Sequence, residues 1–179
     1  MRKQLTNVAR RPLLWATAVF LIFGLSLTML QRPVRGAEAS ARVLARGGGT
    51  TIVEGGTGSP AFVPVITTVA FHAAAAGRTV TGSFECLARA PQAATGAGSA
   101  EFNTNAMYVT GQITDARISG DSATLIGRAT ITGLGAGTAV PFTFVVRKGG
   151  PGATAVLTTD GDTRLVFNEV LLEGSFEVD

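Results

Sequence analysis

Ile113-Thr-Asp-Ala-Arg-Ile-Ser-Gly-Asp-Ser-Ala-Thr-Leu-Ile-Gly-Arg-Ala-Thr-Ile-Thr132 is the stretch that decides the fold. Its second half alternates apolar or small residues with polar ones, which is typical of a half-buried strand. Between the two halves, Ser119-Gly120-Asp121-Ser122 has the glycine-first pair of a type II′ hairpin. We therefore predict an antiparallel hairpin whose second strand points these residues inward: Ala123, Leu125, Gly127, Ala129 and Ile131.

The first strand of this hairpin contains a slip of one residue. Ala116 and Ile118 share a face of the strand, whereas Ile113 is out of phase with them. Because a one-residue slip turns every later side chain to the opposite face, the pattern predicts a β-bulge near Thr114-Asp115. Bulges increase the bend and twist of a strand, which helps a sheet to close on itself.

Most of the remaining chain reads as short strands. Residues 142–147 alternate so that Phe142, Phe144 and Val146 point inward, and residues 80–86 alternate in the same way. No window beyond the first forty residues has the apolar stripe of an amphipathic helix. Further strands are predicted at residues 43–54, 62–73, 102–109, 113–118, 155–158, 164–168 and 170–178, the last with a break at Gly174.

The connections between these strands are rich in turn residues. Asp160-Gly161-Asp162 carries the Asp-Gly signal of a type I′ turn. Residues 73–77 and 91–98 are interpreted as longer, mobile Ala/Gly-rich connections, and residues 148–152 as a loop. Glycines at 47–49 and 55–58 flank the first strand, but no Lys-Ser/Thr pair and helix start follow them. These glycines therefore do not form a phosphate-binding loop.

Short hairpins between successive strands favour an up-and-down order. We predict an all-β, antiparallel meander of about eight to ten strands, closed into a barrel or barrel-like sheet because closure removes exposed edges. The alternative is a two-sheet sandwich. Residues 40–179 are enough for one domain with a core of its own. Cys86 is the single cysteine, so no internal disulfide contributes to stability.

The first forty residues have the layout of a secretory signal. Basic residues precede an apolar run at residues 13–30, and Ala37-Glu38-Ala39 supplies an A-x-A cleavage site. We therefore predict a signal peptide at residues 1–39 and export of residues 40–179 as a secreted, extracytoplasmic bacterial domain. The run approaches the length needed to span a bilayer, and Arg32 and Arg35 follow it. An uncleaved N-terminal membrane anchor is therefore the alternative.

The leader also accounts for the basic charge of the chain. Of 15 basic and 12 acidic side chains, six basic and one acidic lie in residues 1–39, which leaves nine and eleven and a net charge of −2. Beyond Arg147-Lys148 the exported part has no run of basic residues. Phosphate-backbone binding needs such a cluster, so we expect no nucleic-acid partner.

Several of these segments carry a resemblance to a known family. The hairpin of residues 113–127, the strand Val140-Pro-Phe-Thr-Phe-Val-Val146 and Gly150-Pro-Gly152 resemble the post-COAP type of bacterial secreted β-domain. Gly47-Gly48-Gly49 and Gly82-Ser-Phe-Glu-Cys86 are similar to that family's G-G-G start and G-x-F-x-Y strand. The resemblance covers residues 43–178. It implies an extracellular β-domain and brings no catalytic residues with it.

This chain departs from the family pattern in two places. Leu171-Leu172-Glu173-Gly174-Ser175-Phe176 lacks the double glycine of the closing element. The hairpin carries Asp121 where the family usually has Asn. The resemblance therefore bears on the fold and on the extracellular location, and not on an activity.

The single histidine and the single cysteine do not form a catalytic pair. His72 lies opposite Phe71 on an alternating strand, so we expect it at the surface. Cys86 shares a face with Phe84, so we expect a buried structural thiol, with an intermolecular disulfide or a modification site as the alternative. One imidazole supplies neither a triad nor a metal site.

The acidic residues also form no recognisable site. Asp160 and Asp162 flank a turn glycine, where local hydrogen bonds explain them better than a Ca²⁺ site does. Glu169, Glu173 and Glu177 recur every fourth residue, which on a regular strand places all three on the solvated face. The exported part contains no Trp to provide a sugar platform for a carboxylate pair. We assign no catalytic, cofactor-binding or metal-binding residue.

The sequence therefore predicts a non-enzymatic extracytoplasmic module with a structural or protein-binding role. The first alternative is a barrel that carries a small apolar ligand, unless Phe84, Phe142, Phe144 and Phe167 fill its interior. The second alternative is an enzyme of unrecognised type. The expected partner is a protein or a component of the cell envelope, with membrane contact only through residues 13–30 if the leader is retained. The sequence does not identify the partner, a ligand or the oligomeric state.

Overall fold

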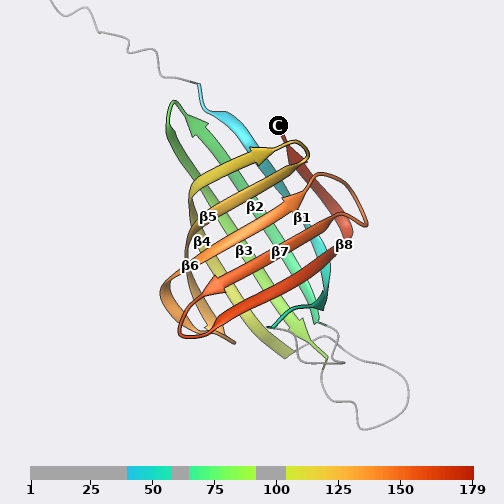
Figure 1. Cartoon of the computed structure of the whole chain (residues 1–179). Helices are drawn as coiled ribbons and strands as arrows, with labels where there is room; N and C mark the ends of the chain where they lie inside the picture. Colours follow the sequence, from blue (N-terminus) through green and yellow to red (C-terminus); the bar gives the residue numbers. More distant parts are fainter. Residues whose placement is uncertain (1–39, 58–64, 92–103) are drawn as a thin grey trace, which may run out of the picture. The chain divides into compact units, whose positions relative to one another are not determined.

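The computed structural model describes residues 40–57, 65–91 and 104–179, and these residues form a closed antiparallel barrel. Each strand pairs with its neighbours in sequence, and β8 pairs with β1 to close the sheet (Figure 1). The strands are β1 (Arg42–Gly55), β2 (Val65–Ala76), β3 (Thr79–Ala90), β4 (Thr104–Ser119), β5 (Ser122–Gly133), β6 (Gly137–Arg147), β7 (Thr154–Asp160) and β8 (Arg164–Val178).

The barrel confirms the all-β antiparallel meander, and the alternative of a two-sheet sandwich is wrong. Two pairs of predicted segments are single strands in the structure. Residues 104–109 and 113–118 both lie in β4, and residues 164–168 and 170–178 both lie in β8. At the predicted breaks the strands contain bulges and a glycine kink but do not end. An irregular pair interrupts the register without ending the ladder.

The hairpin of β4 and β5 has the predicted form. Gly120 has φ of 57°, as the first central residue of a type II′ turn requires, and Ser119 pairs with Ser122. The register between β4 and β5 shifts between Ile113 and Asp115, which confirms the predicted bulge. Ile113 is buried as a result. The predicted inward residues of β5 and β6 are also confirmed, with the non-glycine members all in the core.

Three predicted connections are wrong. Residues 73–76 belong to β2, which ends in a two-residue turn at Gly77-Arg78, because the pairing of β2 with β3 continues through them. Asp160 pairs with Arg164 across a three-residue loop, and Gly161 does not adopt the positive φ of a type I′ turn. Glycines 47–49 lie within β1, not beside it, and a Cβ would meet the backbone of β8 at Gly47 and Gly49 and that of β2 at Gly48. Residues 92–98 lie outside the described residues.

Five phenylalanine rings pack against one another inside the barrel. The rings of Phe84 and Phe144 have centroids 4.8 Å apart, and Phe84 stacks on Phe142 at 5.1 Å. Phe71 contacts Phe144 and Phe176 at 5.4 and 5.6 Å. Such aromatic pairs add to the stabilisation that burial of the rings provides. The inward face of every strand therefore contributes to one continuous core.

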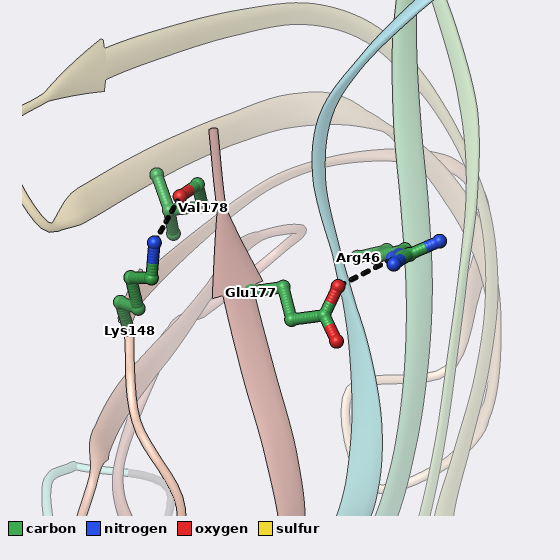
Figure 2. Close-up of polar contacts among 4 residues, drawn as sticks. All are labelled: Arg46, Lys148, Glu177 and Val178. Atoms are coloured by element: carbon green, nitrogen blue, oxygen red, sulfur yellow. Dashed lines mark hydrogen bonds and ion pairs between the residues drawn. The ribbon is translucent and has the colours of Figure 1, made fainter.

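Polar contacts hold the end of β8 between β1 and the loop after β6. Glu177 accepts a hydrogen bond from Arg46 Nε at 2.6 Å, and Lys148 Nζ donates to the Val178 carbonyl at 3.0 Å (Figure 2). Gly149 also forms an isolated bridge with Phe176. The Arg46–Glu177 pair is about half exposed, so solvent screening keeps its contribution small. The β1–β8 ladder and the burial of Phe176 therefore account for most of the closure.

Replacing Gly174 by alanine is expected to lower the free energy of unfolding by more than about 2 kcal/mol. Gly174 has φ of 110°, and a Cβ there would meet the Gly48 carbonyl oxygen at 2.1 Å. The matched control is Gly55→Ala in β1, where the nearest atom would be 3.9 Å from the Cβ. Urea titrations of both variants measure the effect. Equal losses in the two variants would contradict this account of the β1–β8 seam.

The predicted leader, residues 1–39, lies outside the described residues. No helix long and apolar enough to cross a membrane is found in the part of the chain that the structure describes.

Candidate functional site

The structure separates the predicted candidate residues instead of gathering them. His72 is exposed on β2 and Phe71 beside it is buried, which confirms their predicted opposite faces. Asp160 lies 3.5 Å from Arg164 across the β7–β8 loop, and this exposed ion pair is a local contact. Within residues 40–57, 65–91 and 104–179, no three His, Cys, Asp or Glu side chains are grouped as metal ligands would be.

Cys86 is buried in the core with 3 % of its surface exposed, which confirms the predicted buried thiol. Burial raises the pKa of the Cys86 thiol well above its ordinary value, and the nearby charge of Glu169 raises it further. A hydrogen bond with Thr67 opposes this shift. The thiol therefore stays protonated at neutral pH, whereas a nucleophilic cysteine needs its thiolate form.

The prediction that Glu169, Glu173 and Glu177 share a solvated face is wrong. Glu173 and Glu177 are exposed, but Glu169 is only 3 % exposed and points into the barrel. The reason is a register shift between β1 and β8, in which consecutive residues Thr50 and Thr51 pair with Glu173 and Leu171. The extra residue, Leu172, reverses the phase of β8, so that Glu169 lies on the inner face with Leu171.

Glu169 forms a buried hydrogen-bonded cluster with two threonines. The Thr51 and Thr67 hydroxyls both donate to Glu169 Oε2, the latter at 2.7 Å, and the two hydroxyls also contact each other. Thr51 on β1 pairs with Thr67 on β2, and Glu169 on β8 pairs with Val53 on β1. Pairing across three adjacent strands therefore brings these residues together.

Burial raises the pKa of the Glu169 carboxyl, and the hydroxyl donors Thr51 and Thr67 partly oppose that rise. A carboxyl with a raised pKa can act as a general acid when it faces a substrate. None of the three cavities described below, however, is lined by Glu169, Thr51 or Thr67. The cluster therefore gives the buried Glu169 carboxyl its hydrogen-bond partners and links β8 to β1 and β2.

Three open cavities hollow the outer side of β2 to β5. One of about 430 Å³ lies over β3, β4 and β5 and reaches Ala139 of β6, and one of about 470 Å³ lies beside Leu87 and Tyr108. A third of about 250 Å³ shares Leu87 and Tyr108 with the second and Glu85 with the first. We call this surface the hollowed wall. Its outward side chains are Ser83, Glu85, Leu87, Tyr108, Thr110, Gln112, Arg128 and Thr130.

The hollowed wall combines an aromatic and a polar part. Tyr108 is 39 % exposed, which makes it one of the few large apolar side chains on the described surface. At the other end, an Arg128 guanidinium nitrogen donates to the Ala139 carbonyl at 2.8 Å. Ala139 has φ of 53°, a conformation that costs a non-glycine residue energy and often marks a functional surface.

Sequence reasoning missed both the buried Glu169 cluster and the hollowed wall. The apolar run Val170-Leu171-Leu172 does break the alternation before Glu173, and this was the available signal for the bulge that turns Glu169 inward. The hollowed wall has no comparable signal. Its residues come from different strands, and only the strand register brings them together.

The chain matches no protein-family model, no curated protein and no solved structure. The likeness to the post-COAP type of domain therefore stays a prediction from the sequence.

Proposed function

We propose that this chain is a non-enzymatic extracytoplasmic β-barrel module with a protein-binding role, exported by residues 1–39 and released by cleavage after Ala39. The observation that carries the proposal is the packed aromatic interior. Phe84, Phe142 and Phe144 are each no more than 1 % exposed, and their ring centroids lie about 5 Å apart. Interior volume of this kind is core, and it leaves binding to the outer surface.

The hollowed wall is the surface on which we place the partner. Its cavities are open to solvent, and Tyr108 offers a rigid ring with a polar hydroxyl, as side chains at interaction sites often do. Glu85 and Arg128 at the polar end supply opposite charges that fix the orientation of a partner. A protein segment that places an apolar side chain beside Tyr108 and polar groups near Arg128 fits this arrangement.

Two observations favour this role over the alternatives of a ligand carrier and an enzyme. The cavities above 300 Å³ lie on the outer wall, whereas a carrier of the predicted type encloses its ligand inside the barrel. The buried groups with raised pKa values, Cys86 and Glu169, are both hydrogen-bonded to Thr67 within the core. These hydrogen bonds satisfy polar groups that are buried in the core.

Site-specific photo-crosslinking of the exported protein tests this role. A photoreactive residue at position 108 is expected to give an adduct of one defined mass, and the same residue at position 78 none. Arg78 is the control because it is exposed at the tip of the β2–β3 turn, away from the hollowed wall. Leu87→Glu is expected to abolish the adduct at position 108, since it places a charge in the apolar part of the wall.

Three outcomes would overturn the proposal. The first is equal labelling from positions 108 and 78, which indicates non-specific contact. The second is a position-108 adduct that persists at full yield in Leu87→Glu, which places the contact elsewhere. Absence of any adduct from position 108 in the native exported fraction also contradicts a protein-binding hollowed wall.

A further inference from the structure

The polar end of the hollowed wall is a grid of outward polar side chains around one cavity. Strand pairing arranges them in two rows across β3, β4 and β5: Ser83, Gln112 and Arg128 in one, and Glu85, Thr110 and Thr130 in the other. All of them line the open cavity of about 430 Å³, which we call the polar cavity. Its volume lies within the range of roughly 300–1,000 Å³ that is usual for small-ligand sites.

The side chains of the polar cavity combine hydrogen-bond donors with acceptors. The Glu85 carboxylate only accepts and the Arg128 guanidinium only donates, whereas the amide and the three hydroxyls between them do both. In the part of the chain that the structure describes, Arg128 is the only member of the grid whose side chain is hydrogen-bonded to another protein group. A ligand that presents several hydroxyls can therefore use the remaining donors and acceptors.

The charges of the polar cavity favour an uncharged ligand. Among the described residues, Glu85 and Arg128 are the only charged side chains that line it, and their charges cancel. They lie two strands apart, which is about 10 Å. A phosphate would be repelled by Glu85 and an ammonium ion by Arg128. A zwitterion could bridge both ends, but it would leave the neutral amide and hydroxyls between them without partners.

A strained bulge fixes one rim of the polar cavity. In β6, Thr138 and Ala139 lie opposite the single residue Thr130, and Ala139 has φ of 53°. Arg128 Nη1 donates to the Ala139 carbonyl at 2.8 Å, which holds the guanidinium in place and leaves its other N–H donors for a ligand. Strain of this kind is concentrated at binding sites, and a side chain held in position loses less entropy when a ligand binds.

We infer that the polar cavity binds an uncharged saccharide unit. Each sugar hydroxyl both donates and accepts, so one ring can satisfy Glu85 at one end, Arg128 at the other and the neutral side chains between them. The inference rests on the proposed function and specifies the partner further. The partner's protein segment lies beside Tyr108, and a saccharide that the partner carries lies in the polar cavity.

Titration of the exported protein with free sugars tests the saccharide site. The probes are the methyl glycosides of glucose, mannose, galactose and N-acetylglucosamine, each followed by NMR shifts of the Gln112 side-chain amide and Arg128 Nε. At least one probe is expected to bind with a dissociation constant of about 1 mM, as a few solvent-exposed hydrogen bonds allow. The dissociation constant is expected to be the same at low and high salt, because the ligand is uncharged.

Two variants and a control locate the sugar. Glu85→Ala is expected to raise the dissociation constant about tenfold or more, because it removes a hydrogen bond to a charged acceptor, and Gln112→Ala to raise it several-fold. Glu54→Ala is the matched control, since Glu54 is exposed on β1 and does not line the cavity. It is expected to leave the dissociation constant unchanged. Circular dichroism and thermal unfolding check that each variant folds.

Three results would overturn the saccharide site. They are the absence of binding by all four probes at tens of millimolar, equal dissociation constants in wild type and Glu85→Ala, and salt-dependent binding of diglycine in place of the sugars. The position-108 adduct is a separate readout. An adduct without sugar binding overturns this inference alone, whereas sugar binding without an adduct supports the saccharide site and contradicts the protein contact at Tyr108.

Discussion

Replacing Phe144 by alanine is expected to lower the free energy of unfolding by about 3–5 kcal/mol. Phe144 is fully buried, and its ring contacts Phe71 and Phe84 at centroid distances of 5.4 and 4.8 Å. The loss combines the lost burial of the ring with the cavity left behind, which the surrounding strands cannot fill completely. Urea denaturation of wild type and variant measures it. Leu134→Ala, at an exposed turn, is the control and is expected to change stability by less than about 0.5 kcal/mol.

The same variant distinguishes a packed interior from a ligand compartment. A cavity lined by apolar side chains stays dry and binds small apolar molecules such as benzene. Phe144→Ala is therefore expected to be stabilised by benzene, whereas wild type is not. A loss of less than about 1 kcal/mol in Phe144→Ala would show that the ring fills no tightly packed space. Stabilisation of wild type by benzene would show that the interior already holds a cavity.

Replacing Glu169 by glutamine is expected to remove a pH dependence from the stability of the barrel. The folded-state pKa of Glu169 is raised above its ordinary value of 4.5 by burial, so the folded chain holds this proton more tightly than the unfolded chain does. The resulting stabilisation is fully present below about pH 4.5 and is lost as the pH rises through the raised pKa. One proton gives a slope of at most about 1.4 kcal/mol per pH unit.

Urea denaturation between acidic and mildly alkaline pH measures this effect. The stability of Glu169→Gln minus that of wild type is expected to increase as the pH rises. Glu54→Gln, at an exposed position in β1, is the control and is expected to give a curve parallel to wild type. Glu169→Ala is expected to lose about 1–3 kcal/mol, because the Thr51 and Thr67 hydroxyls lose their acceptor. Parallel curves for Glu169→Gln and wild type would contradict this role for the cluster.

The cluster also bears on Cys86, which is the other titratable group close to Glu169. The charge of Glu169 raises the pKa of the Cys86 thiol in addition to the effect of burial. In Glu169→Gln that charge is absent, so the pKa of the thiol is expected to fall while burial still holds it above its ordinary value. The thiol remains protonated over the pH range of the denaturation experiment, so Cys86 does not contribute to the slope.

Local patterns were sufficient to predict much of the barrel. The alternation in residues 123–132, the Ser119-Gly120-Asp121-Ser122 turn and the slip at Ile113 all depend on neighbours in sequence. A hairpin carries its partner strand beside it, so these features could be interpreted without knowledge of the rest of the chain. The bulge at Ile113/Asp115 and the turn at Gly120 were both confirmed for this reason.

The features that were missed depend on contacts between distant parts of the chain. Whether Glu169 points inward is decided by the pairing of β8 with β1, more than a hundred residues earlier, and by the extra residue Leu172 at their register shift. The same pairing brings Thr51 and Thr67 to the Glu169 carboxylate. A regular four-residue spacing predicted one solvated face because it contained no information about that partner strand.

The surfaces could not be predicted for a related reason. Tyr108 and Leu87 share the hollowed wall because β3 pairs with β4 in a register that places them opposite each other. The sequence shows that these residues lie in strands, and the closure of the barrel determines which of them meet.

The most direct test of the account is the native mass of the exported protein purified from its source. A packed, exported module is expected to begin at Ser40 and to retain no apolar small molecule. An apolar compound bound in stoichiometric amount would contradict the packed interior, and a chain that begins at Met1 would contradict the released module.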